Sequence, residues 1–355
     1  MSKRRTIFIA SILLIVIFFE VLFIKLQRFE AISIIPANGM SYLFKSGTSV
    51  NQLVADLKVK SNLKNGFYFK LLLYSKGVAM HLQAGEYFFP AGSTPKVIIE
   101  KLSMGNVVQH SFTIVNGWNI YQILNALAAD PYVQHTLTDQ SLQTIATDIG
   151  CAYVSPEGVL FPDTYFFPLN TPDIDILWRA YVRMQLYMDN VWPKRAQSLP
   201  YKTPYQALVV ASMIEKEAGL PSEMPIIAGI ILKRLALWMP LQIDSTVIYG
   251  LQPNFSGNLT VNDLKKKTPY NTYTHYGLPP TPIAMPGSKA ILAALHPEAT
   301  DYLYFVATGK GGHEFSKTLS EQDVAVKKYQ LKQVPSKMNS VQKTSIVKTK
   351  SQIKH

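Results

Sequence analysis

The sequence predicts an α+β protein attached to a membrane by one N-terminal helix, and three observations support this fold class. An apolar run from Thr6 to Ile24 has the length that a helix needs to cross a bilayer. Residues 44–107 mix capped helical patterns with short strand-like segments. Residues 111–332 combine longer helical patterns with a segment rich in Gly, Pro, Tyr and Asn. The predicted order is therefore an anchor, a small α+β subdomain and a larger mixed α+β domain.

The anchor is expected over residues 1–28, with MSKRR as its basic start. The run that follows is apolar except for Ser11 and Glu20, and no small-x-small cleavage site of a signal peptide comes after it. The basic start favours a cytoplasmic N-terminus, although two basic residues just beyond the run oppose this preference. A buried core helix is the alternative. We expect a single-pass anchor that carries a large external domain.

The subdomain is expected over residues 29–110. A helical spacing of apolar residues follows a cap at Thr48 or Ser49, and NGFYFKLLLYSKG predicts a second helix that ends at a glycine. LQAGEYFFPAG has strand character around a turn. A third helix is expected between a cap at Thr94 and a terminating Gly105.

The larger domain is expected over residues 111–332. It opens with FTIVNGWNIYQILNALA, which predicts a strand, a turn and a helix. Further helices are expected at 174–200, 203–218 and 222–238. For the helix at 203–218, Thr203 is the expected cap, Pro204 fits the first helical position and Gly219 fits the end. The loop-rich stretch 240–300 is uncommon in a compact domain unless it builds a site. DYLYFVATGKGGHEFS then predicts a hairpin.

The net charge of +12 comes partly from the tail, residues 333–355, which has several lysines and no acid and is expected to be disordered. An anionic membrane or cell-wall polymer suits this charge, whereas nucleic acid is disfavoured because no aromatic-basic recognition motif is present. The single Cys151 excludes an intrachain disulfide and a multi-cysteine metal site. No metal or cofactor is expected, because no His/Asp/Glu set has ligand spacing and the phosphate-loop pattern is absent.

The stretch ASMIEKEAGLP, residues 211–221, places two carboxylates in the last turn of an apolar helix, where exposed carbonyl groups favour cations. At about 100° per residue, Glu215 and Glu217 point roughly 200° apart, so both cannot face one cleft. Burial and the helix dipole would push such a carboxyl towards its protonated form, which a general acid needs. The alternative is that both are solvated surface residues, one of them paired with Lys216 or Lys233.

The loop-rich stretch holds further candidates. Asp244 in LQIDSTVIYG is a second carboxylate or an ordinary helix cap. The run YNTYTHY groups aromatic faces with amide and hydroxyl groups, which hold sugars by stacking and hydrogen bonding. His313, just past the glycine turn of the hairpin, is a candidate for a hydrogen bond in the site.

Seven stretches stand in the order LQAGEYFFPAGST, EGVLFPDTYFF, ASMIEKEAG, KRL, LQIDSTVIYG, TPYNTYTHYGLPPTPIAMPG and ALHPEATDYLYFVATGKGGHEFS. In this order the chain resembles the endolytic murein transglycosylases, the YceG-like (MltG) family of bacterial cell walls. The resemblance spans roughly residues 44–330, behind the same kind of anchor. Two positions depart from the family pattern: Ser245 stands where a proline or similar residue is expected, and Asn116 where the family often has Glu.

The resemblance implies a lytic transglycosylase, a lyase that cuts the β-1,4 bond between N-acetylmuramic acid and N-acetylglucosamine inside nascent peptidoglycan strands. The product carries a 1,6-anhydromuramyl end, which terminates glycan elongation. The upstream subdomain would be LysM-like and associated with glycan, and the larger domain would be the YceG-like catalytic domain. The implied location is the bacterial inner membrane, with the catalytic domain outside the cytoplasm. The implied partners are peptidoglycan strands and the wall-synthesis machinery, including penicillin-binding proteins, and no cofactor is implied.

The resemblance assigns catalysis to Glu215, the first glutamate of EKE, and leaves Glu217 as a supporting or surface residue. One carboxyl is sufficient when the nucleophile is the substrate's own C6 hydroxyl. Two other functions stay open: a hydrolase in which Asp244 holds a water, and a non-catalytic scaffold that binds peptidoglycan. The expected substrate-binding residues are Asp244, Gln242, Asn271, Thr272, Tyr273 and His313.

Overall fold

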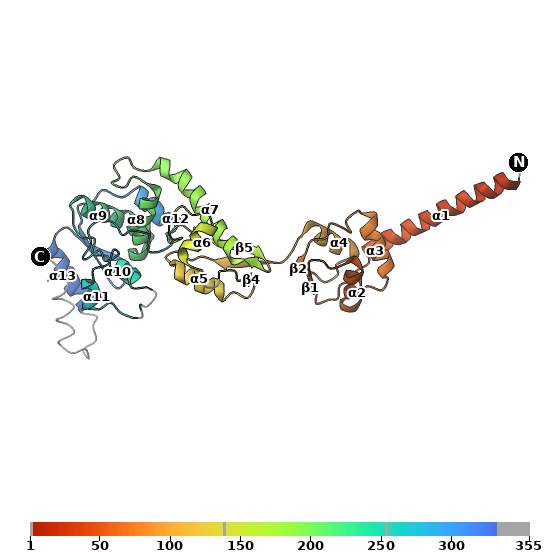
Figure 1. The fold of residues 1–355 in the computed structure, drawn as a ribbon, viewed down its shortest axis with the longest axis horizontal. Coiled ribbons are helices and arrows are strands. Elements are labelled where there is room, and N and C mark those ends of the chain that lie inside the picture. The colour runs from red at the N-terminus through yellow and green to blue at the C-terminus, as the bar shows by residue number, and fades with distance from the viewer. Residues whose placement is uncertain (1–2, 138–139, 253–254, 256, 332–355) are drawn as a thin grey trace. The chain divides into compact units, whose positions relative to one another are not determined.

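The structure, a computed structural model, describes residues 3–137, 140–252, 255 and 257–331 (Figure 1). The described chain divides into two compact units. The first contains the residues up to His110 together with Phe166–Asn170, and the second contains Ser111–Tyr165 and the residues from Thr171 onward. The tail expected to be disordered, residues 333–355, lies outside the described residues.

Helix α1, Lys3–Ala31, is long and apolar enough to cross a membrane. The apolar side chains of its first two thirds are exposed, as those of a helix that crosses a membrane would be. The end of α1 joins the core of the first unit, where Phe29 is buried. Glu30 forms a salt bridge of 2.6 Å with Lys76. The predicted anchor is thus one continuous helix that also packs into the first unit.

The first unit has the mixed α+β composition expected for residues 29–110. Strands β1 (Met40–Phe44) and β2 (Gly85–Phe89) pair antiparallel, with Tyr42 opposite Tyr87. The buried faces of three helices and this ribbon share one hydrophobic core that includes Leu57, Phe69 and Ile98. The helices are α2 (Val50–Lys60), α3 (Gly66–Ser75) and α4 (Pro95–Met104).

Side-chain caps fix the ends of these helices. Ser49, rather than Thr48, caps α2 by accepting a hydrogen bond from the Gln52 N–H, because only the Ser49 hydroxyl stands three residues before that donor. Thr94 caps α4, and Gly105 ends it with a φ of 66°, a left-handed conformation that favours glycine. The predicted cap and stop of α4 are therefore confirmed.

The remaining strands are short. Strands β3 (Gln109–Thr113) and β5 (Thr164–Pro168) pair with each other, and β4 (Val133–Gln134) runs parallel to β6 (Thr171–Pro172). Strands β7 (Tyr304–Ala307) and β8 (His313–Ser316) form the predicted hairpin. The helices of the second unit are α5 (Ile120–Ala128), α6 (Leu142–Asp148), α7 (Asp173–Val191), α8 (Pro204–Glu217), α9 (Met224–Ala236), α10 (Asp244–Gly250), α11 (Val261–Lys265), α12 (Ser288–Leu295) and α13 (Leu319–Val326), with the short helical turns η1 (Trp192–Lys194), η2 (Pro221–Glu223) and η3 (Lys327–Leu331).

Helix α8 is the centre of the second unit's core. Its residues from Ala207 to Ile214 are all buried, and it packs against α9, α10 and α12. A helix buried on every side has no polar face, so its position depends on apolar contacts, each large buried side chain contributing about 1.5–3 kcal/mol. This burial makes α8 a rigid support for the residues at its C-terminal end.

Two expectations about this region are corrected. Gly219 does not end α8 in a left-handed conformation; Ala218 ends it in an extended conformation, and Gly219 is required because a Cβ there would lie 2.7 Å from the Gly311 carbonyl oxygen. The loop-rich stretch 240–300 contains α10, α11 and α12, which are five to eight residues long. Helices this short give little periodicity for a sequence pattern to show.

Candidate functional site

The end of α8 carries the two candidate carboxyls. Thr203 caps the start of the helix by accepting from the Gln206 N–H, and Pro204 occupies the first helical position, as the sequence predicts. Beyond Ile214 the helix leaves the core, and both Glu215 and Glu217 are half-buried while Lys216 between them is exposed. The two glutamates have different neighbours, as their angular separation on the helix requires.

Glu215 lies against two glycine-containing turns. The Gly287 N–H donates to Glu215 Oε2 at 3.0 Å, just before α12 begins. Gly117, in the turn before α5, would bring a Cβ within 3.7 Å of Glu215 Cγ, and its carbonyl accepts from Lys216 Nζ at 3.2 Å. Burial raises the pKa of Glu215, and the Gly287 N–H and the Lys216 ammonium oppose this rise. Glu215 is therefore a partly accessible carboxyl biased towards its protonated form.

Glu217 lies with residues of the following loop. The Ser245 hydroxyl donates to Glu217 Oε1 at 2.8 Å. Burial raises the pKa of Glu217 and the charge of Asp244 adds to the rise, whereas the Ser245 hydrogen bonds and His313 oppose it. The expected binding residues Asp244, Tyr273 and His313 therefore lie around Glu217 and not around Glu215. Glu217, Asp244, Ser245 and Tyr273 are called the Glu217 cluster below.

Asp244 and Tyr273 form a direct pair. Asp244 is the first residue of α10, and the Tyr273 hydroxyl donates to its Oδ1. Tyr273 is only 9% exposed, and burial together with the Asp244 carboxylate raises the pKa of its hydroxyl. The hydroxyl therefore remains a neutral donor that fixes one oxygen of the Asp244 carboxylate.

Asn271 and Thr272 are placed differently from the expectation. Both are fully buried. Asn271 Nδ2 donates to the carbonyl oxygens of Leu264 (3.0 Å) and Lys266 (2.6 Å), and Thr272 Oγ1 accepts from the Ile243 N–H at 2.9 Å. Direct contact with a substrate is not supported for these two side chains, because they hold the backbone of the loop together.

Gln242 is also held by the protein. Its backbone has a φ of 55°, and its N–H donates to the Thr272 carbonyl oxygen at 3.0 Å. Its side-chain oxygen accepts from Arg234 Nη1 at 3.2 Å. The buried Arg234 guanidinium also donates to the carbonyl oxygens of Pro240, Leu241 and Leu303. Arg234, which the sequence indicates only as part of the KRL resemblance, fixes the two residues before Gln242 and joins them to Leu303, just before β7.

His313 pairs with a carboxylate that the sequence did not single out. Glu223 Oε1 accepts from the His313 N–H at 2.9 Å, and Glu223 Oε2 lies 2.7 Å from His313 Nδ1. The ring contacts Phe305 edge-on. Glu223 is 90 residues away in sequence, and no local pattern connects it with the hairpin. His313 is therefore oriented through one ring nitrogen beside the Glu217 cluster.

Glu157 is a second carboxyl that sequence reasoning did not assign. It is fully buried, and the Ile120 N–H, at the start of α5, donates to its Oε2 at 3.0 Å. Burial raises the pKa of Glu157 to about 8, and the Ile120 and Gly158 N–H groups, the Tyr249 hydroxyl and the Lys216 ammonium offset only part of the effect. A charged residue in the apolar stretch VSPEGVLFP was the signal that could have identified it.

Among the residues that the structure describes, no group of three or more His, Cys, Asp or Glu residues could hold a metal ion. The candidate site offers carboxyl, hydroxyl, amide and imidazole groups. Two carboxyls with raised pKa lie at one helix end, one bonded to a backbone N–H and the other to a side-chain hydroxyl, and such groups can donate and accept protons.

Comparisons with known proteins support a cell-wall function. The model of a family described as the YceG-like family matches residues 43–328. A Bacillus subtilis (strain 168) protein named endolytic murein transglycosylase is 33% identical over 304 residues, which cover 80% of this chain and 83% of that protein. A Streptococcus pneumoniae (strain R6) protein of the same name is 26% identical over 314 residues, covering 77% of this chain and 55% of that protein.

A solved structure shares the fold. The crystal structure of a YceG-like protein from Listeria monocytogenes superposes with a TM-score of 0.52 at 26% identity. The match covers 81% of this chain and 98% of the Listeria chain. The mixed α+β architecture is thus shared over almost the whole of that structure.

Proposed function

The chain belongs to the YceG-like family, and we propose from this premise that it is a membrane-anchored endolytic lytic transglycosylase of peptidoglycan. It cuts the β-1,4 bond between N-acetylmuramic acid and N-acetylglucosamine within glycan strands and leaves a 1,6-anhydromuramyl end. The observation that carries the proposal is Glu215, a half-buried carboxyl with a raised pKa that lies in the family's EKE stretch.

Glu215 would act first as an acid and then as a base. Its proton moves to the glycosidic oxygen as the bond from that oxygen to C1 breaks and C1 becomes oxocarbenium-like. The O6 hydroxyl of the same muramic acid then bonds to C1, and its proton returns to the Glu215 carboxylate. No water is consumed, and the attack gains from being intramolecular. The raised pKa supports the first step because it favours the protonated form that a general acid needs.

The Glu217 cluster would hold the sugar next to the cleaved bond. Ser245, Asp244 and Tyr273 offer hydroxyl and carboxylate groups around Glu217, and such groups bind sugar hydroxyls. His313 lies beside this cluster with Nδ1 held by Glu223. The loop backbone would be held in place by the buried side chains of Asn271 and Thr272 and by the turn at Gln242.

The first unit would be LysM-like and contribute glycan binding. A groove of about 460 Å³ lies between the loop 44–51 and residues 79–84, and Tyr74 also lines it. Ser46, Thr48, Ser49 and Asn51 supply hydroxyl and amide groups on one side. An aromatic ring with polar edges suits a sugar chain. The N-terminus would be cytoplasmic and the catalytic domain outside the cytoplasm, within reach of wall-synthesis enzymes such as penicillin-binding proteins.

The test is mass spectrometry of products from purified peptidoglycan incubated with the full-length protein and with its Glu215→Gln and Glu217→Gln variants. We expect anhydromuramyl ends from the parent protein and a fall of about 10²–10⁴-fold for Glu215→Gln. A smaller fall is expected for Glu217→Gln, the matched variant two residues away.

Three outcomes would contradict the proposal. Reducing ends in place of anhydro ends would identify a hydrolase and direct attention to Asp244 as the group that holds water. Full activity of Glu215→Gln with loss in Glu217→Gln would move the acid to Glu217. Binding without any product would leave a peptidoglycan-binding scaffold.

A further inference from the structure

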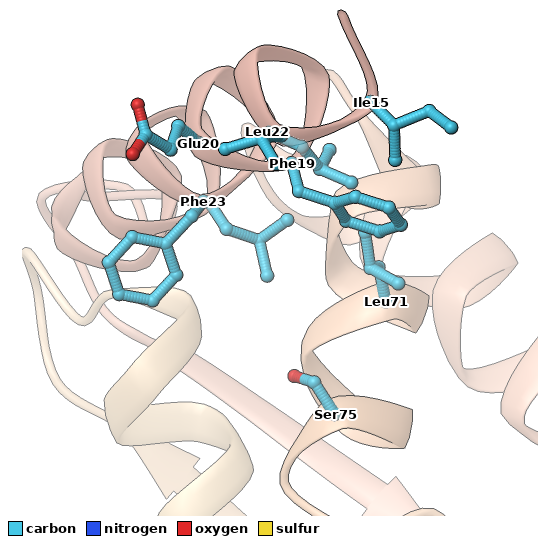
Figure 2. Close-up of a pocket in the computed structure, with 9 residues that line it drawn as sticks. Ile15, Phe19, Glu20, Leu22, Phe23, Leu71 and Ser75 are labelled. Atoms are coloured by element: carbon cyan, nitrogen blue, oxygen red, sulfur yellow. The ribbon is translucent and has the colours of Figure 1, made fainter. Parts of the chain in front are cut away.

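An apolar groove of about 530 Å³ lies between α1 and α3 within the first unit (Figure 2). Phe19, Leu22 and Phe23 of α1 form one wall, and Leu71 and Ser75 of α3 face them. The α1 side chains belong to the membrane-crossing run. A groove that includes them is therefore exposed to lipid and not to water when α1 crosses the membrane.

The depth of the groove follows from the helix rise. Ile7 to Ile24 spans about 27 Å at 1.5 Å per residue, close to the thickness of a bilayer hydrocarbon core. Phe19 and Phe23 lie in the last third of this span. Because Leu71 shares the groove with them, α3 lies beside the outer part of the hydrocarbon region and not above it.

The exposed face of α3 suits such a position. Phe67 lies one helical turn before Leu71 and is 65% exposed, and Tyr74 is 61% exposed. Aromatic side chains are favoured where the hydrocarbon meets the headgroups. The basic residues Lys25 and Lys64 are exposed near the ends of the two helices, where phosphate groups lie.

The orientation of α3 against α1 is fixed by specific contacts. Lys76 at the end of α3 forms its salt bridge with Glu30 of α1, and the rings of Phe29 and Tyr68 lie 5.7 Å apart. Helix α3 therefore follows α1 to whatever depth the anchor takes in the bilayer. The first unit cannot withdraw α3 from the lipid without breaking these contacts.

We infer that α3 is an interfacial helix embedded in the outer leaflet of the membrane that α1 crosses, with phospholipid acyl chains in the groove and Phe67 and Leu71 inserted among them. Tyr74 of α3 also lines the polar groove of the first unit. Contact between α3 and lipid would therefore hold that groove beside the membrane surface. The inference depends on the anchor and is independent of the catalytic reaction.

The test uses the full-length chain in vesicles of equal parts phosphatidylcholine and phosphatidylglycerol. Cys151→Ser removes the single native cysteine, and an environment-sensitive nitrobenzoxadiazole label is attached at Phe67→Cys, Leu71→Cys or the control Val59→Cys. Val59 is 85% exposed on α2 and does not line the groove. Lipids that carry a nitroxide quencher near the headgroup or deep in the acyl chain then report contact and depth.

We expect blue-shifted emission and at least a twofold loss of fluorescence to the shallow quencher at positions 67 and 71, with neither effect at position 59. The same result is expected in a Glu215→Gln background, which separates this inference from the proposed function. Water-like emission at both 67 and 71 would overturn the inference. Blue-shifted emission without lipid quenching would also overturn it, because a protein surface and not lipid would then occupy the groove.

Discussion

Replacing Glu157 with Gln should stabilise the protein at neutral pH and remove a pH dependence of its stability. Burial raises the pKa of the Glu157 carboxyl from 4.5 to about 8. The folded protein keeps this proton up to about pH 8, whereas the unfolded chain releases it above its ordinary pKa. Because the unfolded state then binds fewer protons, the free energy of unfolding falls as the pH rises from about 4.5 to about 8.

The magnitude follows from the size of the shift. The unfolded chain releases the Glu157 proton while the folded protein keeps it. At about 1.4 kcal/mol per pH unit, this difference lowers the free energy of unfolding, relative to its value at low pH, by about 0.7 kcal/mol at pH 5 and about 4 kcal/mol at pH 7.5. These are upper limits, since a buried carboxyl that ionises can recruit water or relax. A Gln side chain has no proton to lose, and its oxygen can still accept from the Ile120 N–H. The advantage of Glu157→Gln should therefore grow by up to about 3 kcal/mol between these pH values.

Differential scanning calorimetry of the full-length protein in detergent would measure this effect. For a unit of about 200 residues, 3 kcal/mol corresponds to a shift of about 6–12 °C in Tm. Glu298→Gln, which removes an exposed carboxylate of the same unit, is the control and should not reproduce the trend. A Glu157→Gln advantage that stays constant or shrinks from pH 5 to pH 7.5 would refute the reasoning.

Three further substitutions test the contacts around the site. Ser245→Ala removes a donor to the Glu217 carboxylate, so the pKa of Glu217 should rise further, and a limb of the pH–activity profile that depends on Glu217 should move to higher pH; the shift should vanish in a Glu217→Gln background. Tyr273→Phe should lower the free energy of unfolding by about 1–3 kcal/mol in urea titrations, and adding Asp244→Asn should cost less than the sum of the two changes, because both remove one hydrogen bond. Arg234→Lys should cost about 3 kcal/mol in the same titration, since an ammonium cannot reproduce the planar set of bonds to three carbonyl groups; a loss below 1 kcal/mol would contradict this role.

The parts of the fold that the sequence predicts are those set by neighbouring residues. The cap at Thr203 and Pro204 predicts the start of α8, and both act within one turn of it. Thr94 and Gly105 define α4 in the same way. Each of these signals acts on the helix next to it, either through a side chain that bonds to the helix or through a backbone conformation that ends it. No tertiary contact is therefore needed to recognise the signal.

The arrangement of the site depends on contacts between distant residues. Glu157 accepts from Ile120, 37 residues away, and Glu223 accepts from His313, 90 residues away. The sequence alone does not assign the role of Asn271, because an amide in a turn-rich loop fits substrate binding and loop stabilisation equally well. Its burial against the Leu264 and Lys266 carbonyl oxygens favours loop stabilisation. Residue type and spacing therefore predict a functional loop without assigning the role of each side chain.

The two carboxyls at the end of α8 are tolerated because each has its own compensation. Exposed carbonyl groups at a helix end disfavour negative charge, and burial adds to the cost. Glu215 obtains a hydrogen bond from the Gly287 N–H, whereas Glu217 obtains one from the Ser245 hydroxyl, on a different segment. The pKa of each glutamate can therefore be set by its own donor, and a change at Ser245 need not alter Glu215. This separation would allow one helix end to hold the proposed proton-transferring group on one side and the proposed sugar-binding cluster on the other.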